Sequence, residues 1–364
     1  MAVPFVDLKA QLASIRADVD AAIARVLDDT SFVLGPHLEA FERDFARFSE
    51  VKHVVGVGNG TDALELAFRA LGLRGEVVMP ANTFVATPLA AVRAGLRPVF
   101  VDVDPDTLLL DPAKLDDAIG AETSALVPVH MFGQVAPMTR LAELAQARDL
   151  ALVEDVAQAH GARREGKVAG TFGDIAATSF YPGKNLGAYG DGGAVMTDDD
   201  ALAGEVRALR NYGSEVKYHH PKMGFNSRLD PIQAAILGVK LQHLSAWTRA
   251  RRAAAERYDR LLADVDGVRR PVTPAGTEPV WHLYVVRVPE RDRVMEAMRA
   301  AGVGVGVHYP VPCHLQGAFA KLGHARGDFP VAEEAAETML SLPMFPEIAE
   351  AQQEEVVRAL RAAL

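Results

Sequence analysis

The sequence has almost no cysteine and no long apolar run, and these two absences exclude several classes of protein. Cys313 is the single cysteine among 364 residues, so an intrachain disulfide is impossible. No apolar stretch reaches the length of a transmembrane helix. The segment Met1–Asp7 lacks the basic start and the long apolar core of a signal peptide. We therefore expect no membrane partner and a cytoplasmic location.

Positive charge is also scarce, which weighs against nucleic acid as a partner. The chain has 38 Lys and Arg residues against 48 Asp and Glu residues, and its formal net charge is −10. Non-specific binding of nucleic acid usually needs a basic face. Hydrophobic residues make up 49% and charged residues 24%, an ordinary globular composition. The length allows one large domain and a smaller one.

Short apolar segments alternate with helical patterns from about residue 50 to residue 200. Most are continuous runs of Val, Leu, Ile and Ala, as in strands that are buried on both faces of a mostly parallel sheet. This alternation predicts an α/β protein with a three-layer αβα large domain, in which ligands bind beyond the carboxyl ends of strands. The expected strands are Val54–Val57, Glu76–Met79, Pro98–Val103, Ser124–Val129, Leu150–Val153, Ile175–Phe180 and Ala194–Thr197.

We divide the chain into an arm and helix at residues 1–30, a large domain at 31–240 and a smaller C-terminal α/β domain at 241–364. Asp230-Pro231 has the pattern of a helix start, with an N-cap residue followed by proline. A long helix is expected from there into the 250s. The smaller domain is expected to contain strands at Leu283–Val288 and Val303–Val307, a helix at Arg291–Ala301 between them, and terminal helices.

An apolar segment that ends in Glu154-Asp155 is the first candidate for chemistry. Pyridoxal phosphate (PLP) needs a carboxylate beside its pyridine nitrogen, because the protonated ring takes up electrons from a carbanion. Such an acid, taken alone, is more often a helix cap or a surface residue.

Lys184 lies in a glycine-rich loop between two expected strands, about 30 residues after that acid. Glycines let a backbone approach a ligand closely. A lysine that is buried or near another cation loses its proton more easily, as a Schiff-base lysine must. A Gly-Lys-Asn triplet alone usually marks a surface loop, but its pairing with the strand-end acid favours a Schiff base at Lys184.

The turn Gly58-Asn59-Gly60-Thr61 opens directly into a helical pattern and is a candidate phosphate seat. Free backbone N–H groups at a helix start bind phosphate, and Ser179 can supply a further hydroxyl. The turn lacks the G-x-G-x-x-G spacing and a matching ribose-binding acid, which disfavours a dinucleotide enzyme.

Together these elements resemble the DegT/DnrJ/EryC1/StrS family of sugar aminotransferases, which are fold-type I PLP enzymes. The similarity covers nearly the whole chain, from Pro4-Phe5-Val6-Asp7-Leu8 to His308-Tyr309-Pro310, and the loop at residues 181–193 is its most specific part. The resemblance implies that Lys184 carries PLP and shuttles the proton, and that Asp155 partners the pyridine nitrogen. It also implies that Gln158 lies beside the phenolic oxygen of the cofactor, that Phe84 stacks on its ring, and that the phosphate set is Gly60, Thr61 and Ser179.

The resemblance further implies that Asn226 reaches the phosphate of a neighbouring subunit. The active sites would then be shared, in an enzyme that is at least a homodimer. The candidate sugar and nucleotide contacts are Tyr181, Asn185, Tyr212, Lys217, Tyr218, His219, His220, Arg228, His308 and Tyr309. Adjacent histidines lack the usual spacing of metal ligands, so we expect no metal.

The implied reaction moves an amino group from L-glutamate, through the pyridoxamine phosphate form of the cofactor, to a nucleotide-linked keto-sugar. The Lys184 loop is most similar to members that aminate C3 of dTDP-3-keto-6-deoxyhexoses. A 4-keto sugar, a UDP- or GDP-linked sugar and a PLP-dependent sugar dehydratase remain as alternatives. Known dehydratase branches replace the lysine with histidine, so Lys184 favours transamination. A regulatory protein with this fold is disfavoured, because the lysine, the acid and the phosphate set are all present.

Overall fold

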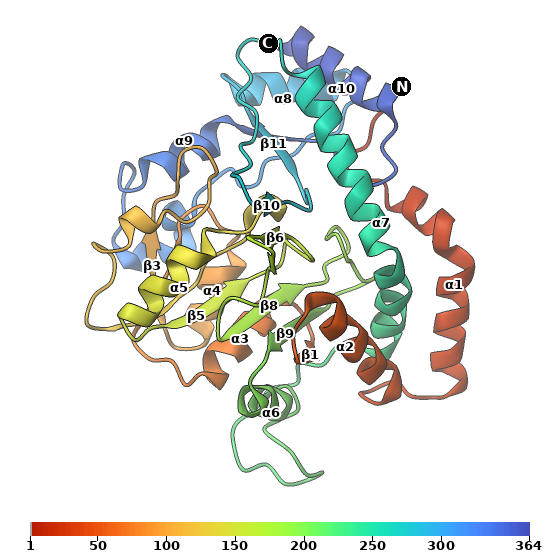
Figure 1. Ribbon diagram of the computed structural model, residues 1–364, viewed down its shortest axis with the longest axis vertical. Coiled ribbons are helices and arrows are strands. Elements are labelled where there is room, and N and C mark those ends of the chain that lie inside the picture. Colours follow the sequence, from red (N-terminus) through yellow and green to blue (C-terminus); the bar gives the residue numbers. More distant parts are fainter. Residues whose placement is uncertain (1) are drawn as a thin grey trace.

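The computed structural model describes residues 2–364 and has a seven-stranded sheet at its centre (Figure 1). Strand β9 runs antiparallel to both of its neighbours, while the four pairs from β8 to β3 are parallel. All seven expected strands form, and the mostly parallel sheet is confirmed. In spatial order the strands are β1 (His53–Val57), β9 (Gly193–Thr197), β8 (Ile175–Ser179), β5 (Ala151–Asp155), β4 (Thr123–Leu126), β2 (Glu76–Pro80) and β3 (Arg97–Val101).

Helices cover both faces of this sheet and make a three-layer unit. Side chains alternate between the faces along each strand, so neighbours such as Val54 and Val55 belong to different cores. One core packs against α2 (Pro36–Ser49), α5 (Met138–Ala147) and the first half of α7 (Pro231–Leu261). The other core packs against α3 (Gly60–Ala70), α4 (Ala86–Arg93) and α6 (Asp200–Leu209).

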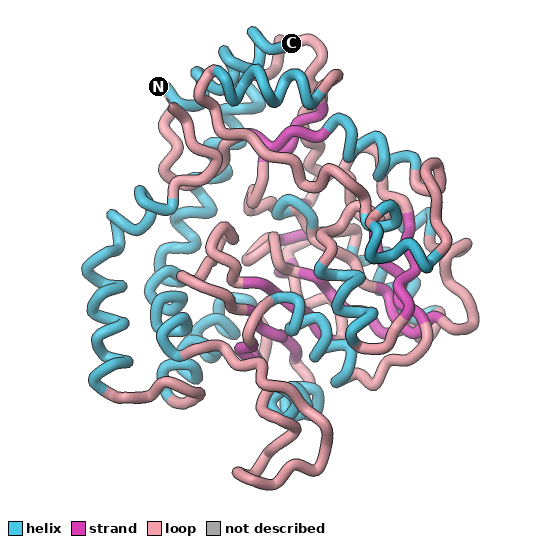
Figure 2. Tube along the Cα trace, turned by 180° about the vertical axis from the view of Figure 1, so that it is seen from behind, coloured by secondary structure: helices cyan, strands magenta, loops and turns pink. Residues whose placement is uncertain are grey.

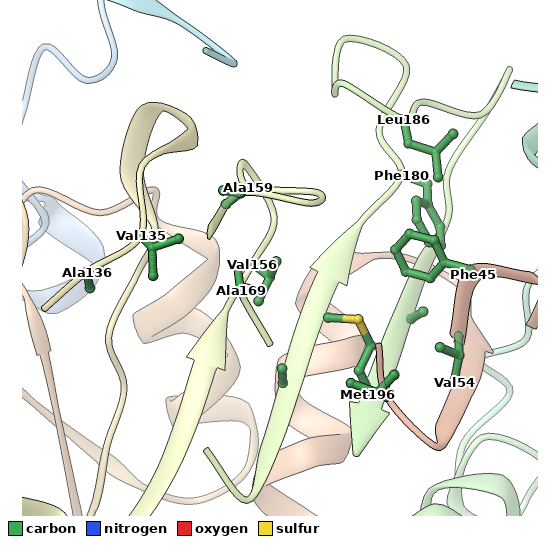
Figure 3. Packing of buried hydrophobic residues seen from close by; sticks show 14 of the residues in the cluster. Phe45, Val54, Val135, Ala136, Val156, Ala159, Ala169, Phe180, Leu186 and Met196 are labelled. Atoms are coloured by element: carbon green, nitrogen blue, oxygen red, sulfur yellow. The ribbon is translucent and has the colours of Figure 1, made fainter. Parts of the chain in front are cut away.

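Aromatic residues pack where the first core approaches the Lys184 loop (Figure 3). The rings of Phe45 and Phe180 lie edge to face with their centroids 5.3 Å apart. Leu186, from the loop itself, belongs to the same cluster and is fully buried. The loop is therefore anchored in the core of the large unit rather than free at its surface.

A smaller unit follows α7 and carries a two-stranded antiparallel sheet of β11 (Tyr284–Arg287) and β12 (Met339–Leu342). The strand expected at Val303–Val307 is wrong, because this segment makes only isolated bridges to Val3 and Ser341. The backbone of Phe5 packs against Gly304, where an added Cβ would lie 2.6 Å from the Phe5 nitrogen. The N-terminal arm thus bonds to the start of this segment through Val3, while β12 bonds to it only at Gly306, so no continuous ladder forms. The helices here are α8 (Arg291–Ala300), α9 (Pro330–Thr338) and α10 (Glu350–Ala363).

Helix α1 (Leu8–Asp28) lies beside α7 along one side of the molecule (Figures 1 and 2). Its buried residues Ile15 and Val19 contact Ile236 and Trp247 of α7. Helix α7 begins at Pro231 as expected, but the Asp230 side chain makes no capping hydrogen bond. The helix runs without a break through residue 240, so it joins the two units, and the domain limits stay predictions. The short strands are β6 (Arg163–Arg164), β7 (Lys167–Val168) and β10 (Thr277–Glu278).

No helix within residues 2–364 is both long and apolar enough to cross a membrane.

Candidate active site

A cavity of about 790 Å³ lies where the carboxyl ends of β5 and β8 face the smaller unit. The start of α3 closes one side of it, and the segment before β11 closes another. Ten of the residues singled out in the sequence line this cavity, namely Gly60, Thr61, Phe84, Asp155, Gln158, Ser179, Tyr181, Lys184, His308 and Tyr309. The fold therefore brings the lysine, the acid and the phosphate seat together.

Asp155 is the last residue of β5, and it is buried with its carboxylate hydrogen-bonded. Its Oδ2 accepts from the Thr87 hydroxyl at 2.9 Å, and its Oδ1 accepts from the Ala157 N–H at 3.1 Å. The Thr83 hydroxyl lies 2.8 Å from that of Thr87, so a chain of hydroxyl groups leads to the acid. Burial raises the pKa of Asp155, while these hydrogen bonds and the charge of Lys184 oppose that rise.

Lys184 reaches the same cavity from the loop between β8 and β9. Its backbone N–H donates to the carbonyl oxygen of Tyr181 at 2.8 Å, which forms a tight turn. Burial lowers the pKa of Lys184 from 10.5 to about 8, although attraction to Asp155 opposes this shift. A substantial fraction of the lysine is therefore neutral near physiological pH, and a neutral amine is the form that acts as a nucleophile.

The loop around Lys184 is clamped from helix α7. The Lys240 side chain, which is 1% exposed, donates from Nζ to the carbonyl oxygen of Gly187 at 2.6 Å. The Gln233 side chain accepts from the N–H of Tyr189 at 2.8 Å. At Gly187 an added Cβ would lie 2.4 Å from the carbonyl oxygen of Pro182, so the loop folds back closely on itself. These contacts hold the lysine backbone in place.

The first turn of α3 forms a cradle for an anion. Asn59 caps the helix by accepting from the N–H of Asp62 at 2.8 Å. The N–H groups of Gly60 and Thr61 have no acceptor among residues 2–364, and they point out from the helix start. An added Cβ at Gly60 would lie 2.6 Å from the Cβ of Ser179, so only glycine lets the turn approach β8 this closely. A phosphate group suits this arrangement.

Comparison with known proteins decides the family. The DegT/DnrJ/EryC1/StrS aminotransferase family matches residues 13–361. The chain belongs to this family. A dTDP-3-amino-3,4,6-trideoxy-alpha-D-glucose transaminase from Streptomyces venezuelae is 48% identical over 361 residues, which are 99% of this chain and 95% of that protein. A UDP-N-acetyl-3-dehydro-alpha-D-glucosamine 3-aminotransferase from Acidithiobacillus ferrooxidans is 44% identical over 365 residues, which are 100% and 98% of the two chains.

The S. venezuelae DesV crystal structure, in complex with a ketimine intermediate, has a TM-score of 0.97 to this chain at 48% identity. The match covers 99% of this chain and 98% of the DesV chain. The fold is thus that of the fold-type I aminotransferases, as expected from the sequence.

Aminotransferases of this family use PLP, and the residues on the cavity fit that cofactor. The cofactor, when bound, supplies an electron sink at the substrate carbon. Asp155 would hold a proton at the pyridine nitrogen, and the Lys184 amine would bind the cofactor and move a proton at the substrate carbon. The cradle at Gly60, Thr61 and Ser179 would take the phosphate.

Gln158 and Tyr309 form a hydrogen-bonded pair on the aminotransferase cavity. Gln158 Nε2 donates to the Tyr309 hydroxyl at 3.3 Å, and its Oε1 accepts from the N–H of Phe132 at 2.7 Å. The rings of Phe84 and Tyr309 lie 5.0 Å apart at a tilt of 37°, and half of Phe84 is exposed. These three side chains form one wall, where an aromatic ring can lie against Phe84.

A second group of predicted residues does not line this cavity and belongs to the segment after α6, whose loop extends from the lower end of the molecule in Figure 1. Arg228 donates to the side chain of Asn211 at 2.9 Å, and Asn226 is exposed. An open depression here is lined by Tyr212, Lys217, Tyr218 and His220, and His219 lies in the same loop. Ser227, between Asn226 and Arg228, accepts from the N–H of Gly58 at 3.1 Å and donates to Asp62 at 2.7 Å, so this end of the segment lies against the start of α3. The roles of the predicted residues in this group stay predictions.

Asn185 has a different place from the other predicted contacts, because it is buried behind the cavity. Its Nδ2 donates to the carbonyl oxygen of Val280 at 2.9 Å, and its Oδ1 lies 3.0 Å from His282 Nδ1. Its polar atoms are thus committed to the protein, and His282 lines the cavity instead.

Three residues important to this site were missed from the sequence, namely Thr87, Lys240 and His282. A signal existed only for Thr87, which lies one helical turn after Thr83 beyond the end of a strand. Lys240 and His282 belong to no motif.

Proposed function

We propose that this aminotransferase moves the amino group of L-glutamate to C3 of a dTDP-linked 3-keto-6-deoxyhexose. The observation that carries the proposal is that Lys184, Asp155 and the Gly60 cradle meet at one cavity. A cavity of about 790 Å³ has room for a substrate as large as a nucleotide-linked sugar beside the cofactor. The 48% identity to a dTDP-3-amino sugar transaminase supports the dTDP-linked 3-keto substrate.

Lys184 does the proton transfer in both halves of the proposed reaction. A general acid and base works best when its pKa is near the working pH, and burial lowers the pKa of Lys184 to about 8. The hydrogen bonds from Thr87 and Ala157 favour the charged form of Asp155 and oppose the effect of burial on its pKa, which suits a partner for a protonated cofactor nitrogen. Binding of the sugar falls to side chains such as Tyr181, His308 and Tyr309, which line the cavity.

The test is an assay of a panel of keto-sugar nucleotides with L-glutamate. We expect 2-oxoglutarate and an amino sugar to form in equal amounts, with the new amine at C3 by NMR. Lys184→Ala should lose turnover and the absorbance of the lysine-bound cofactor. Normal turnover in that variant would disprove the role of Lys184. Preferred amination at C4, preferred use of UDP- or GDP-sugars, or loss of water without 2-oxoglutarate would each replace the proposed substrate or reaction.

The proposal includes a homodimer with shared sites and a cytoplasmic location. Asn226 is exposed and does not line the cavity of its own subunit, which suits a residue that serves a neighbour. A two-fold dimer is also the commonest assembly of soluble proteins.

A further inference from the structure

His282 lies on the wall of the cavity that the smaller unit provides, in the segment that leads into β11. The large unit contributes Asp155, Ser179 and Gly60 to the same cavity, and these are the groups that fit the ring nitrogen and the phosphate of PLP. Groups on the wall of the smaller unit are therefore left to contact the substrate.

Asn185 determines which nitrogen of His282 carries the proton. Asn185 Nδ2 donates to the Val280 carbonyl oxygen at 2.9 Å, so its Oδ1 must face His282 Nδ1, 3.0 Å away. An amide oxygen only accepts, so His282 donates from Nδ1, and Nε2 of the neutral ring is an acceptor. Burial, helped by the nearby charge of Lys184, holds the pKa of His282 well below its usual value, so the ring stays neutral.

Two other histidines near Lys184 do not offer a defined acceptor. His160 uses both nitrogens within the protein, since Nδ1 accepts from the Leu186 N–H at 3.4 Å and Nε2 bonds to the Thr178 hydroxyl at 2.8 Å. His308 Nδ1 lies 2.9 Å from the Ser341 hydroxyl, which can donate or accept, so its tautomer stays open. His282 Nε2, by contrast, has no partner among residues 2–364, and its ring lines the cavity.

We propose that His282 determines substrate specificity by accepting, at Nε2, a hydrogen bond from a hydroxyl group of the sugar ring. The inference rests on the proposed function, because the donor belongs to the keto-sugar. A keto or phosphate oxygen cannot be that donor, since neither carries hydrogen at neutral pH. The donor is on the sugar rather than the base, because His282 is held by Asn185, the residue that follows Lys184, and the reacting carbon of the sugar has to come to Lys184.

The test measures binding of paired amino-sugar nucleotides to the pyridoxamine phosphate form of the enzyme, with which they cannot react. The two sugars of a pair differ by one ring hydroxyl, and calorimetry gives each Kd. Wild type should bind one hydroxylated sugar about tenfold more tightly than its deoxy partner, the worth of one neutral hydrogen bond.

His282→Asn should bind both sugars of that pair equally, because the amide can still donate to Asn185 but lacks an atom at Nε2. His243→Asn on α7, where the ring stacks on Trp247, is the matched control and should keep the preference of wild type. ¹⁵N NMR of histidine-labelled enzyme should show a neutral His282 ring with hydrogen on Nδ1, assigned by its loss in His282→Asn.

Four results would count against these ideas, and they are distinguishable. Failure of wild type to bind any sugar nucleotide overturns the proposed function. Equal affinity of wild type for both members of every pair overturns the role of His282 alone, as does an unchanged preference in His282→Asn. Hydrogen on Nε2 of His282 also overturns it, because that nitrogen would then be a donor.

Discussion

At Asp155 a carboxylate is buried at the end of a strand, and its neighbours oppose the cost of that burial. Desolvation favours the neutral acid, whereas the hydrogen bonds from Thr87 and Ala157 favour the charged form. Thr87 is itself fully buried, with Thr83 as its partner. The hydroxyl of Thr87 therefore helps to keep charged the residue that must hold a proton on the cofactor.

Replacing Thr87 with valine should shift the pH dependence of the enzyme while the shape of the side chain is kept. Loss of the donor raises the pKa of Asp155, so its carboxylate becomes protonated at a higher pH than in wild type. The acid limb of the pH profile of kcat/KM should shift to higher pH by up to about one unit. Thr338→Val, which removes a hydroxyl that donates to the Glu334 carbonyl, is the control and should leave the profile in place. A downward shift would contradict the role given to Thr87.

At the scale of elements, the start of α3 and the end of β8 approach so closely that a side chain does not fit between them. Gly60→Ala puts a Cβ 2.6 Å from that of Ser179, so the turn must move away from the strand. If the N–H groups of this turn bind the phosphate, as proposed, the affinity for PLP should fall at least about tenfold. Equilibrium dialysis or fluorescence titration of the cofactor measures this loss.

Gly204→Ala in α6 is the matched control for that change. An added Cβ there meets nothing within 4 Å, so the helix should be stabilised by roughly 0.5–1 kcal/mol without any change in cofactor affinity. Equal cofactor affinity in the Gly60→Ala variant and wild type would show that the phosphate binds elsewhere.

The contact between α7 and the Lys184 loop makes a prediction about stability. Burial lowers the pKa of Lys240 from 10.5 to about 8. Between these two values the unfolded chain holds a proton that the folded chain has released, so the free energy of unfolding rises with pH in this window. The full rise is about 3 kcal/mol, from the size of the shift. Lys240→Met should lack this contribution.

Denaturant unfolding of the holoenzyme at pH values from about 7.5 to 10.5 compares the slopes of wild type and Lys240→Met. Lys321→Met removes an exposed lysine and should follow the slope of wild type. If the free energy of unfolding changes with pH in the same way in wild type and Lys240→Met, Lys240 is not desolvated in the folded protein.

At the scale of the whole molecule, the predicted residues divide between the cavity and the loop after α6. If each loop serves the partner's site, two inactive variants can complement one another. Lys184→Ala removes the lysine, and Asn226→Asp places a negative charge against the phosphate. In a random mixture half of the dimers are hybrids with one intact site each, so about a quarter of wild-type activity should return. No recovery after proven subunit exchange would mean that each site belongs to one chain.

The strands of the large unit could be predicted from the sequence, and so could the candidate lysine, acid and glycine turn that line one cavity. Each of these features is local, because burial on both faces gives continuous apolar runs and a ligand-binding turn needs glycines at neighbouring positions. The resemblance to a family rests on the same local runs of residues, and the family match confirms it.

Tertiary structure alone decided the features that depend on distant partners. β11 pairs with β12 over four residues, whereas the segment at residues 303–307 makes only single bridges to Val3 of the N-terminal arm and to Ser341 of β12. Thr87 is hydrogen-bonded to Asp155, which is 68 residues away in the sequence. The bond between Lys240 and Gly187 joins residues 53 apart, and that between His282 and Asn185 joins residues 97 apart. A threonine, a lysine or a histidine looks the same in the sequence whether its partner is water or a buried carboxylate, carbonyl or amide. Only the fold supplies that partner and, with it, the function of the residue.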